Sequence, residues 1–434
     1  APASLPKYGA HFDLPMAIAL LVISGQLPQE ALKSTLLAGE LALDGSLRAI
    51  PGAITHAAVA VSGAIQTVIL PAQSAEQAAL VDNVTVLAAT SLKDVFRHLI
   101  NEQPLRTQTT AIVTEQAAET SVIDDIRGQD QAKRALTIAA AGRHNILLSG
   151  PPGAGKTMLA KALVDILPPL SRSEVIEVTK LHSLAGENYA SAITSRPFRS
   201  PHHSSSHIAL VGGGTSPRPG QISLAHRGVL FLDELPEYNR QALESLRQPL
   251  EDKSISIARA NESVSFPADF MLVATRNPCP CGYASDPEHE CSCRPHAIEQ
   301  YQKKLSGPLL DRIDMTITIS RVDPTTLLRV TTSHDQTRHA KEQIATALIR
   351  QRRRFNTDNQ TNANLSSKDI ERLAYLEPAA RTLMERAGHN LKLSARSYFK
   401  IIKVARTIAD IEDSDVILGS HLSEALQYRA RNNV

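Results

Sequence analysis

The sequence predicts an α/β fold followed by a helical C-terminal domain. Short apolar strands alternate with helical segments over residues 1–115, and a strand, a glycine-rich loop and a helix follow one another at 145–164. In the last quarter of the chain, apolar side chains repeat at helical spacing. At about 150 residues per domain, 434 residues leave room for three domains. We expect them at 1–115, 121–320 and 321–434, with a polar linker at about 101–120.

Composition excludes several classes of protein. Hydrophobic residues make up 42% of the chain, which excludes intrinsic disorder. The 46 basic and 44 acidic residues leave a net charge of +2, which excludes a histone-like polycation. With 8 Phe, 8 Tyr and no Trp, a surface that binds single strands mainly by base stacking is not expected. Residues 1–120 carry 6 basic and 10 acidic side chains against 40 and 34 in residues 121–434, so a polyanion would favour the second part.

Two uncharged segments raise the question of a membrane span. Residues 14–29 are too few to cross a bilayer, and residues 49–75 are interrupted by Pro51, Gly52, Gly63 and Pro71. No signal peptide is visible. The chain starts at an alanine rather than a methionine, so we expect the first domain to be N-terminally incomplete. We predict a cytoplasmic protein without a membrane partner.

The first domain is predicted from its alternating elements. An Asp-Gly pair at 44–45 between two short extended runs is typical of a hairpin turn. Ser91 and Asp94 have the spacing of a capping box at a helix start. The expected elements are a helix at 14–24, a hairpin at 40–48, a helix at 53–63, strands at 67–70 and 84–88, and a helix from 91.

The second domain contains the phosphate-binding pattern G-x-x-x-x-G-K-[ST] at 150–157, between a strand and a helix. Its glycines let backbone N–H groups point at phosphates, and the helix N-terminus adds a favourable dipole. We expect Lys156 to reach the β- and γ-phosphates of ATP and the Thr157 hydroxyl to bind Mg²⁺. The expected nucleotide contacts are Gly150, Pro151, Pro152, Gly153, Ala154, Gly155, Lys156, Thr157 and Met158.

Later strands of this domain end in polar residues that suit catalysis. One apolar strand delivers Asp233 and Glu234 to its carboxyl end, where ligands bind in open α/β sheets. We expect Asp233 to hold Mg²⁺ and Glu234 to orient the attacking water. The next strand ends at Asn277, which we favour as a sensor of the γ-phosphate over a simple turn residue. Arg312 is either a γ-phosphate ligand or the partner of Asp314 in a surface ion pair.

All four cysteines lie within one short stretch, 279–293, as two Cys-x-Cys pairs. Clustered cysteines in a cytoplasmic chain are more often metal ligands than disulfides, and four thiolates close a structural, tetrahedral Zn²⁺ site. His289 and His296 are alternative ligands. Two disulfides or an iron–sulfur cluster are the competing interpretations. The expected zinc ligands are Cys279, Cys281, Cys291 and Cys293.

The run from Arg196 to His203, the three glycines at 212–214 and the stretch 219–235 are very similar to the YifB/ComM family of magnesium-chelatase-like AAA+ ATPases. The resemblance covers essentially the full chain. The N-terminal domain resembles the proteolytic domain of Lon proteases. The nucleophilic Ser and the Lys of that pattern are absent from the matching stretches, 13–16 and 51–54, so we expect no peptidase activity.

The resemblance implies an ATP-driven hexameric DNA motor that promotes branch migration of recombination intermediates during natural transformation. It also implies that Arg312 is an arginine finger offered to the neighbour's ATP and that Arg396 is the sensor-2 arginine. The adenine would lie near residues 126–129, with Gln129 as a contact, and residues 321–434 would form a lid. The partners implied are DNA of any sequence, five further copies of the chain, and recombination proteins.

Three basic regions are candidates for DNA contact. Lys156 and Asp233 lie 77 positions apart, which is long for one strand–helix–strand step, and the related family places an insertion here that faces the ring pore. A hairpin at 254–266 is the second region. The third is the run 329–354, with seven basic and two acidic residues, which we favour as a DNA-phosphate contact over a solvated helix face. For the paired histidines we favour a pore loop over a metal site, and each basic side chain could equally lie on a solvated face. The candidates are Arg196, Arg199, His202, His203, Arg218, Lys253, Arg259, Arg352 and Arg353.

Three other functions compete with a DNA motor. A magnesium-chelatase motor needs partner subunits and lacks a Lon-like N-terminal domain. An ATP-regulated adaptor would use the Lon-like domain to bind proteins, but intact Lys156, Asp233, Glu234 and Arg312 argue against an inactive ATPase. An active Lon-type protease is disfavoured by the missing Ser and Lys.

Overall fold

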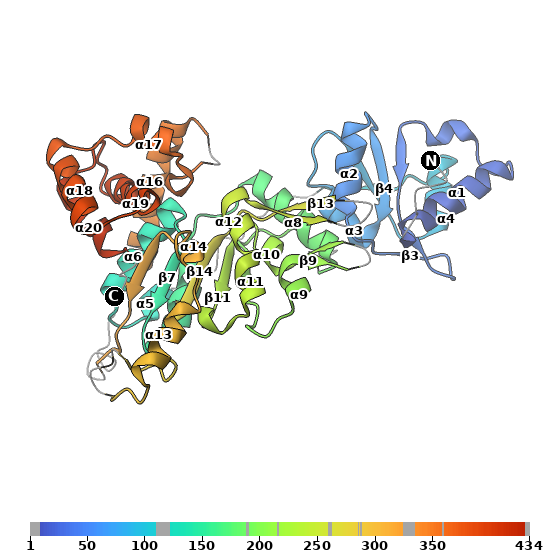
Figure 1. Cartoon of the computed structure of the whole chain (residues 1–434). Coiled ribbons are helices and arrows are strands. Elements are labelled where there is room, and N and C mark those ends of the chain that lie inside the picture. Colours follow the sequence, from blue (N-terminus) through green and yellow to red (C-terminus); the bar gives the residue numbers. More distant parts are fainter. Residues whose placement is uncertain are drawn as a thin grey trace. The chain divides into compact units, whose positions relative to one another are not determined.

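The computed structural model describes residues 9–109, 122–187, 191–214, 217–258, 263–284, 286, 289–323, 335–357 and 360–429 (Figure 1). The chain divides into two compact units. One comprises Ala1–Glu115 and Pro169–Ser195, and the other comprises Gln116–Pro168 and Arg196–Val434. Among the described residues, no helix is long and apolar enough to cross a membrane.

The first unit is built on a four-stranded sheet in the order β1-β4-β5-β6. The first three strands are parallel, and β6 pairs antiparallel with β5 at the edge. Both residues of β6 are exposed, so no apolar pattern distinguished this strand from the predicted linker. The elements are α1 (Asp13–Ile23), β1 (Thr35–Leu37), β2 (Glu40–Leu41), β3 (Leu47–Arg48), α2 (Ala53–Ser62), β4 (Thr67–Pro71), α3 (Ala72–Ala78), β5 (Thr85–Ala89), α4 (Leu92–Leu99) and β6 (Arg106–Thr107), with short 3-10 turns at Ala10–Phe12 and Gln29–Leu32.

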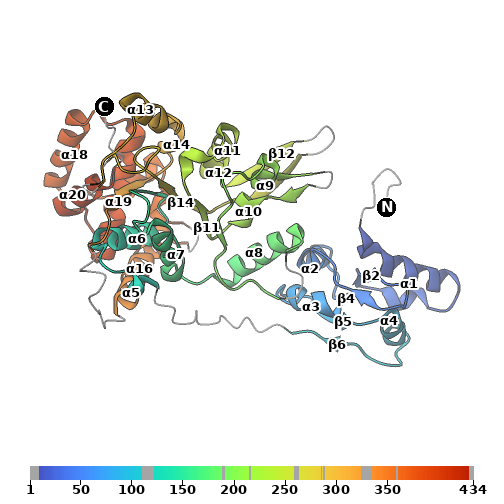
Figure 2. The ribbon, with the colours of Figure 1, turned by 90° about the horizontal axis from the view of Figure 1, so that it is seen from below.

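Helix α8 (Arg172–Ala185) packs with this first unit, although it follows the phosphate-binding motif in the chain (Figure 2). Its Val175 and Val178 are buried against Ile54 of α2 and Leu80. The Ser183 hydroxyl accepts a hydrogen bond of 2.9 Å from the backbone N–H at the start of α2. The sequence places this helix in the 121–320 domain, whereas its apolar face lies in the core of the N-terminal unit.

The second unit is centred on a parallel five-stranded sheet in the order β15-β7-β14-β11-β8. The strands are β7 (Ile146–Ser149), β8 (Phe198–Arg199), β11 (Val229–Leu232), β14 (Met271–Arg276) and β15 (Met315–Thr318). Successive residues of a strand point to opposite faces. Ile146 and Leu148 therefore join the core shared with the C-terminal helices, while Leu147 joins a second core on the other face.

Helices cover both faces of this sheet. The other elements are α5 (Val122–Asp125), α6 (Asp130–Gly142), α7 (Lys156–Ile166), α9 (His207–Val211), β9 (Gly212–Gly213), β10 (Arg218–Pro219), α10 (Gln221–Leu224), α11 (Arg240–Ser245), α12 (Arg247–Asp252), β12 (Ser254–Ala258), β13 (Ser263–Pro267), α13 (Pro295–Lys303) and α14 (Gly307–Leu310), with a 3-10 turn at Leu235–Glu237. The carboxyl ends of β7, β11 and β14 meet at one edge, which positions the site described below.

The C-terminal part is helical, as predicted. Its elements are α16 (Asp335–Phe355), α17 (Ser367–Leu373), α18 (Pro378–Asn390), α19 (Ala395–Ile411) and α20 (Gly419–Gln427), with a 3-10 turn at Asn362–Asn364. Ile402, Ala405 and Ile408 of α19 are buried in the same core as β7. The fold class, α/β with a parallel sheet and a helical C-terminal region, is confirmed.

Candidate active site

The glycine-rich loop between β7 and α7 has the backbone that its sequence predicts. Gly153 and Gly155 have φ angles of 76° and 83°, in the left-handed region that favours glycine. A side chain on Gly150 would overlap the carbonyl oxygen of Ile319. Helix α7 begins at Lys156, directly after this loop. The N–H groups in the first turn of a helix have no acceptor within the helix, so this N-terminus is suited to bind a phosphate.

Lys156 is buried and held by three oxygen acceptors. Its ammonium donates to the carbonyl oxygens of Gly150 at 2.7 Å and Pro151 at 2.9 Å, and to Oδ1 of Asn277 at 2.9 Å. Burial lowers the pKa of Lys156, while the carboxylates of Asp233 and Glu234 act in the opposite direction. A desolvated cation at the mouth of the phosphate loop suits a polyphosphate ligand.

A hydrogen-bond network joins the ends of β11 and β14. The Thr275 hydroxyl donates to Oδ1 of Asp233 at 2.6 Å and accepts from the Glu234 N–H at 2.8 Å. The Thr157 hydroxyl lies 3.4 Å from Oδ2 of Asp233. Asn277 Nδ2 donates to Oε1 of Glu234 at 3.3 Å. The structure thus brings together all the residues predicted for hydrolysis except the two arginines.

Thr275 is a residue that the sequence reasoning missed. It is the penultimate residue of β14 and lies two positions before Asn277, which follows the strand. That spacing was the signal that could have found it. Thr157 and Asp233 supply the hydroxyl and carboxylate oxygens that Mg²⁺ prefers, and Thr275 fixes the carboxylate.

The predicted adenine segment faces the glycine-rich loop. Ile126 and Gln129 line a cavity of about 380 Å³ together with residues 152–155 and Met158. Gln129 Nε2 donates to the carbonyl oxygen of Ser320 at 2.6 Å, which joins the segment to the chain after β15. Arg321, which the sequence reasoning did not select, lines the same cavity and lies 3.4 Å from the carbonyl oxygen of Pro152.

Arg312 and Arg396 meet at one carboxylate, Glu251. Their guanidinium groups lie 2.6 and 2.5 Å from the same oxygen, Oε1. Among the described residues, neither arginine has a hydrogen bond or ion pair with Lys156 or with the Asp233–Glu234 pair. Arg312 does not pair with Asp314 either. That carboxylate accepts instead from the Asn145 N–H.

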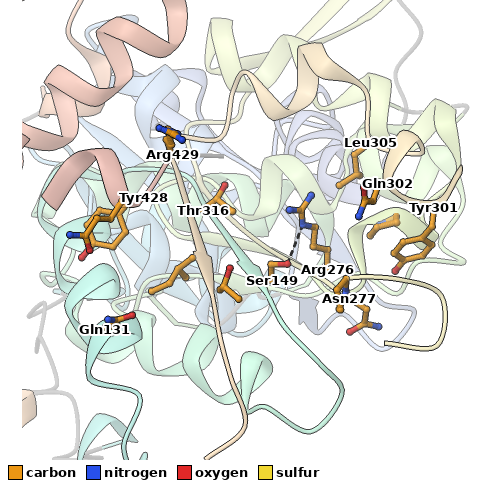
Figure 3. Close-up of a pocket in the computed structure, with 15 residues that line it drawn as sticks. Gln131, Ser149, Arg276, Asn277, Tyr301, Gln302, Leu305, Thr316, Tyr428 and Arg429 are labelled. Atoms are coloured by element: carbon orange, nitrogen blue, oxygen red, sulfur yellow. Dashed lines mark hydrogen bonds between the residues drawn. The ribbon is translucent and has the colours of Figure 1, made fainter. Parts of the chain in front are cut away.

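A second cavity, of about 440 Å³, is lined in part by Asn277 (Figure 3). Asn277 and Tyr301 line one part of it, and Arg276 and Arg429 contribute two cations. Arg276 Nε donates to the Ser149 hydroxyl at 3.2 Å, at the end of the strand that leads into the phosphate loop. Burial lowers the pKa of Arg276.

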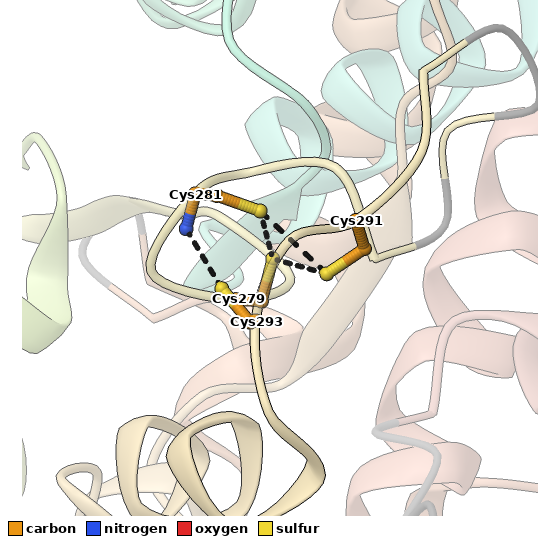
Figure 4. A group of neighbouring side chains, drawn as sticks. All are labelled: Cys279, Cys281, Cys291 and Cys293. Carbon is orange, nitrogen blue, oxygen red and sulfur yellow. Dashed lines mark hydrogen bonds between the residues drawn. The ribbon is translucent and has the colours of Figure 1, made fainter.

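The four cysteine sulfurs lie within 4.8 Å of one another (Figure 4). Cys291 Sγ is 3.7 Å from the Cys279 sulfur and 3.6 Å from the Cys281 sulfur, and all four cysteines are free thiols. Tetrahedral Zn²⁺ with Zn–S bonds of about 2.3 Å separates its sulfurs by about 3.8 Å. The donor set therefore fits Zn²⁺.

The two histidines considered as ligands lie outside that sulfur group. His289 stacks on Tyr283, with ring centroids 5.1 Å apart, and accepts from Arg321 at 3.2 Å. Arg321 also pairs with Asp286 at 3.3 Å. A Cβ on Gly282 would clash with the ring of Pro152, so the cysteine loop packs directly against the phosphate loop.

Two of the DNA-contact candidates are engaged within the protein. Arg196 donates to the carbonyl oxygens of Pro168 at 2.5 Å and Arg227 at 2.6 Å. Lys253 lies 3.5 Å from Asp269, a carboxylate that also binds Arg143 and Arg227. These contacts assign both side chains a structural role in the described chain.

The β9–β10 and β12–β13 strand pairs, which belong to two of the regions predicted to contact DNA, lie side by side (Figures 1 and 2). Strand β10 pairs antiparallel with β9, and Arg218 of β10 is exposed. Gly212 of β9 lies against the side chain of Ile257 in the β12–β13 hairpin. Arg259 falls outside the described residues. Arg199 lies on edge strand β8.

The paired histidines lie near the catalytic network. His203 lines a cavity of about 620 Å³ with Glu234 and Asn277. His202 Nδ1 lies 2.7 Å from the Ser204 hydroxyl, and the two histidine rings are 4.0 Å apart. Among the described residues, neither histidine belongs to a group that could hold a metal.

The basic run at the end of α16 divides between two environments. Arg350 and Arg354 pair with Asp410 of α19, and Arg350 also contacts Asp413 and Asp415. Arg352 and Arg353, the two residues predicted to contact DNA, are exposed. The run therefore stabilises the helical domain through part of its charge and presents the rest to solvent.

Comparison with known proteins agrees with this geometry. Residues 122–327 match the family "Magnesium chelatase, subunit ChlI", residues 334–429 its C-terminal family, and residues 1–74 the family "Subunit ChlI of Mg-chelatase". The chain is 44% identical to competence protein ComM of Haemophilus influenzae and 42% identical to YifB of Escherichia coli. Each alignment covers 99% of this chain and 84% of the relative. The chain belongs to the YifB/ComM family.

Membership in the YifB/ComM family implies an ATPase of the magnesium-chelatase-like AAA+ type that uses ATP and Mg²⁺. A magnesium-chelatase 67 kDa subunit of Chlorobaculum tepidum is 29% identical over only 36% of the chain. The similarity to the YifB/ComM proteins is therefore both higher and more extensive.

Proposed function

We propose that this protein is an ATP-driven hexameric motor that moves along DNA and promotes branch migration of recombination intermediates during natural transformation. The observation that carries the proposal is the hydrogen-bond network at the carboxyl edge of the sheet, in which Thr275 joins two groups. These are Lys156, Asn277 and Glu234, and Asp233 with Thr157. These residue types, gathered beside a phosphate-binding loop, support hydrolysis of a nucleoside triphosphate.

The separation of Arg312 and Arg396 from that network supports a ring. Hydrolysis gains about 10³-fold or more from a guanidinium at the γ-phosphate, supplied in cis or by a neighbour. Because these arginines contact neither Lys156 nor Glu234 in their own chain, we propose that each subunit offers them to the next subunit's ATP. Hydrolysis would then depend on assembly.

The adjacent β9–β10 and β12–β13 loops support DNA as the polymer that is moved. Arg218 is exposed on the first loop, beside the hairpin that forms the second. In a ring, six copies of these loops would surround one pore. Cationic contacts to phosphates carry no sequence information, which suits a motor that acts on any DNA.

We also propose a structural Zn²⁺ at the four cysteines. The spacing of their sulfurs fits the metal, and four protein ligands leave no position open for water. The cysteine loop follows Asn277 after one proline and packs on Pro152. The metal would therefore fix the position of Asn277 relative to the phosphate loop.

Hydrolysis assays on assembled protein test the proposal. We expect the wild type to hydrolyse ATP faster when branched DNA is present, and Lys156→Ala to hydrolyse none. Arg312→Ala should lose at least 10³-fold in kcat while it still binds a fluorescent ATP analogue. An ATPase that neither binds nor responds to branched DNA would contradict the DNA-motor proposal.

A further inference from the structure

Glu251 is the group that holds the two arginines together. It lies in the last turn of α12, and its Oε1 is 2.6 Å from Arg312 and 2.5 Å from Arg396. Arg312 follows α14, and Arg396 lies in the first turn of α19. Three distant parts of the chain therefore converge on one carboxylate oxygen.

The two arginines depend on Glu251 to different degrees. Arg312 is nearly buried, with 13% of its side chain exposed, and also donates to the carbonyl oxygen of Pro308 at 2.6 Å. Its Nε is buried and has no hydrogen-bond partner in the part of the chain that the structure describes. Arg396 is half exposed, and Glu251 is its one hydrogen-bonding and ion-pairing partner among the described residues.

The carboxylate also balances charge. Two guanidinium groups bound to one oxygen repel each other, and the negative charge between them offsets that repulsion. The hydrogen bond from Arg312 lowers the pKa of Glu251, so the carboxylate is ionised at neutral pH. A neutral side chain at this position would leave two adjacent cations without a counter-charge.

We propose that Glu251 is a positioning residue that holds Arg312 and Arg396 as a pair, oriented to bind the γ-phosphate of ATP in the neighbouring subunit. This inference rests on the proposed ring. A guanidinium has five N–H donors, so each arginine can keep its contact with Glu251 and still donate to a phosphate. Glu251 itself touches no nucleotide; it fixes the geometry of the groups that do.

Replacing the carboxylate tests this role. Glu251→Gln should lower the kcat for ATP hydrolysis at least tenfold, while the dissociation constant of a fluorescent ATP analogue stays within twofold. Glu251→Asp should restore part of the rate. Asp252→Asn, which removes the same charge one residue further along α12 from an exposed side chain, should hydrolyse ATP like the wild type.

Mixed rings separate positioning from simple structural support. Lys156→Ala subunits cannot hydrolyse ATP but keep Glu251, Arg312 and Arg396. Mixing them with Glu251→Gln subunits places intact arginine pairs against intact ATP sites, so the rate should rise several-fold above the sum of the two variants measured apart. The inference would be overturned if the Glu251→Gln variant hydrolysed ATP at the wild-type rate. It would also be overturned if the variant were slow and mixing it with Lys156→Ala subunits did not raise the rate.

The ring itself is checked on the wild type. A wild-type protein that hydrolyses ATP as a monomer would overturn the proposed function, and the trans role of Glu251 with it. A wild-type ring that hydrolyses ATP, together with a fully active Glu251→Gln ring, would overturn the Glu251 inference alone.

Discussion

The ammonium of Lys156 lies 2.9 Å from the side-chain oxygen of Asn277, so the phosphate loop and the end of β14 are joined by one hydrogen bond. The amide nitrogen of Asn277 donates in turn to Glu234. A phosphate that draws Lys156 away from Asn277 would therefore change the group that orients Glu234. This relationship is the basis for proposing Asn277 as a sensor of the γ-phosphate.

Removing the amide should separate binding from hydrolysis. Asn277→Ala leaves the loop and helix N-terminus intact, so nucleotide affinity should stay within about threefold of the wild-type value. Loss of one preorganised donor typically costs about 10²–10³-fold in kcat. Steady-state hydrolysis and equilibrium binding measure the two effects. Equal losses in kcat and in nucleotide affinity would show that Asn277 only supports the phosphate loop.

Thr275 should act through the metal ligand. Thr275→Val keeps the shape of the side chain but leaves Oδ1 of Asp233 without its 2.6 Å hydrogen bond. Loss of a partner that orients a ligand costs about 10–100-fold in metal affinity, so the Mg²⁺ concentration for half-maximal hydrolysis should rise by that factor. Thr275→Ser keeps the hydroxyl and is the control. An unchanged Mg²⁺ dependence in Thr275→Val would refute the role.

Asp269 and the three cations around it should make the stability of the fold depend on pH in the acid range. Burial on its own would raise the pKa of Asp269, but Arg143, Lys253 and Arg227 outweigh it and lower the pKa below 3.8. A carboxyl group whose folded-state pKa is lowered stabilises the fold above its unfolded value and loses that contribution as the pH falls through the folded value. The contribution should thus be constant from neutral pH down to about pH 4 and be lost below it.

Denaturation of Asp269→Asn measures this contribution. The substitution leaves three cations near a largely buried position without their carboxylate. We therefore expect the free energy of unfolding at pH 7 to fall by about 3–5 kcal/mol. The difference from wild type should shrink below pH 4. A difference that stays the same at pH 3 would exclude an electrostatic origin.

Lys253 and Arg218 should differ in their effect on DNA binding. Arg218 is exposed, whereas Lys253 is paired with Asp269. Arg218→Gln should weaken binding to DNA of any sequence and flatten the dependence of affinity on salt. Lys253→Gln should mainly lower thermal stability. Fluorescence anisotropy at several salt concentrations distinguishes them, and an identical loss of affinity in both variants would contradict the assignment.

Metal analysis tests the cysteine site. Protein purified without chelator should contain about one equivalent of zinc, and less than about half an equivalent would contradict the site. Cys279→Ser removes a buried ligand, so it should lose the metal and lower the melting temperature. Ser245→Ala, outside the cluster, should keep its zinc.

The sequence was most informative where local chemistry decides the structure. The glycine pattern at 150–157 requires one particular backbone conformation. The strands that lead to Asp233 and Asn277 are apolar enough to be recognised from the sequence. The sequence therefore singled out most of the residues that the structure brings together in the hydrogen-bond network and all four of the sulfur cluster. The structure adds that their elements meet at one edge of a single sheet.

Features that depend on long-range packing were not predictable. Helix α8 has a clear capping box at Ser171 and Glu174, yet its pattern could not say that Val175 packs against Ile54, which lies more than a hundred residues earlier in the chain. Glu251 belongs to a helix with no distinctive motif, and only the fold brings it to Arg312. The basic candidates were similarly ambiguous, because an ion pair such as Lys253–Asp269 leaves no local signature.

The central claim is that ATP hydrolysis at this site moves a DNA branch point. It is tested most directly by incubating the protein with a synthetic four-way junction and ATP and following the separation of the junction into duplexes. We predict rapid conversion by the wild type and none by Lys156→Ala or Glu234→Gln. A wild type that hydrolyses ATP but leaves the junction intact would contradict the account.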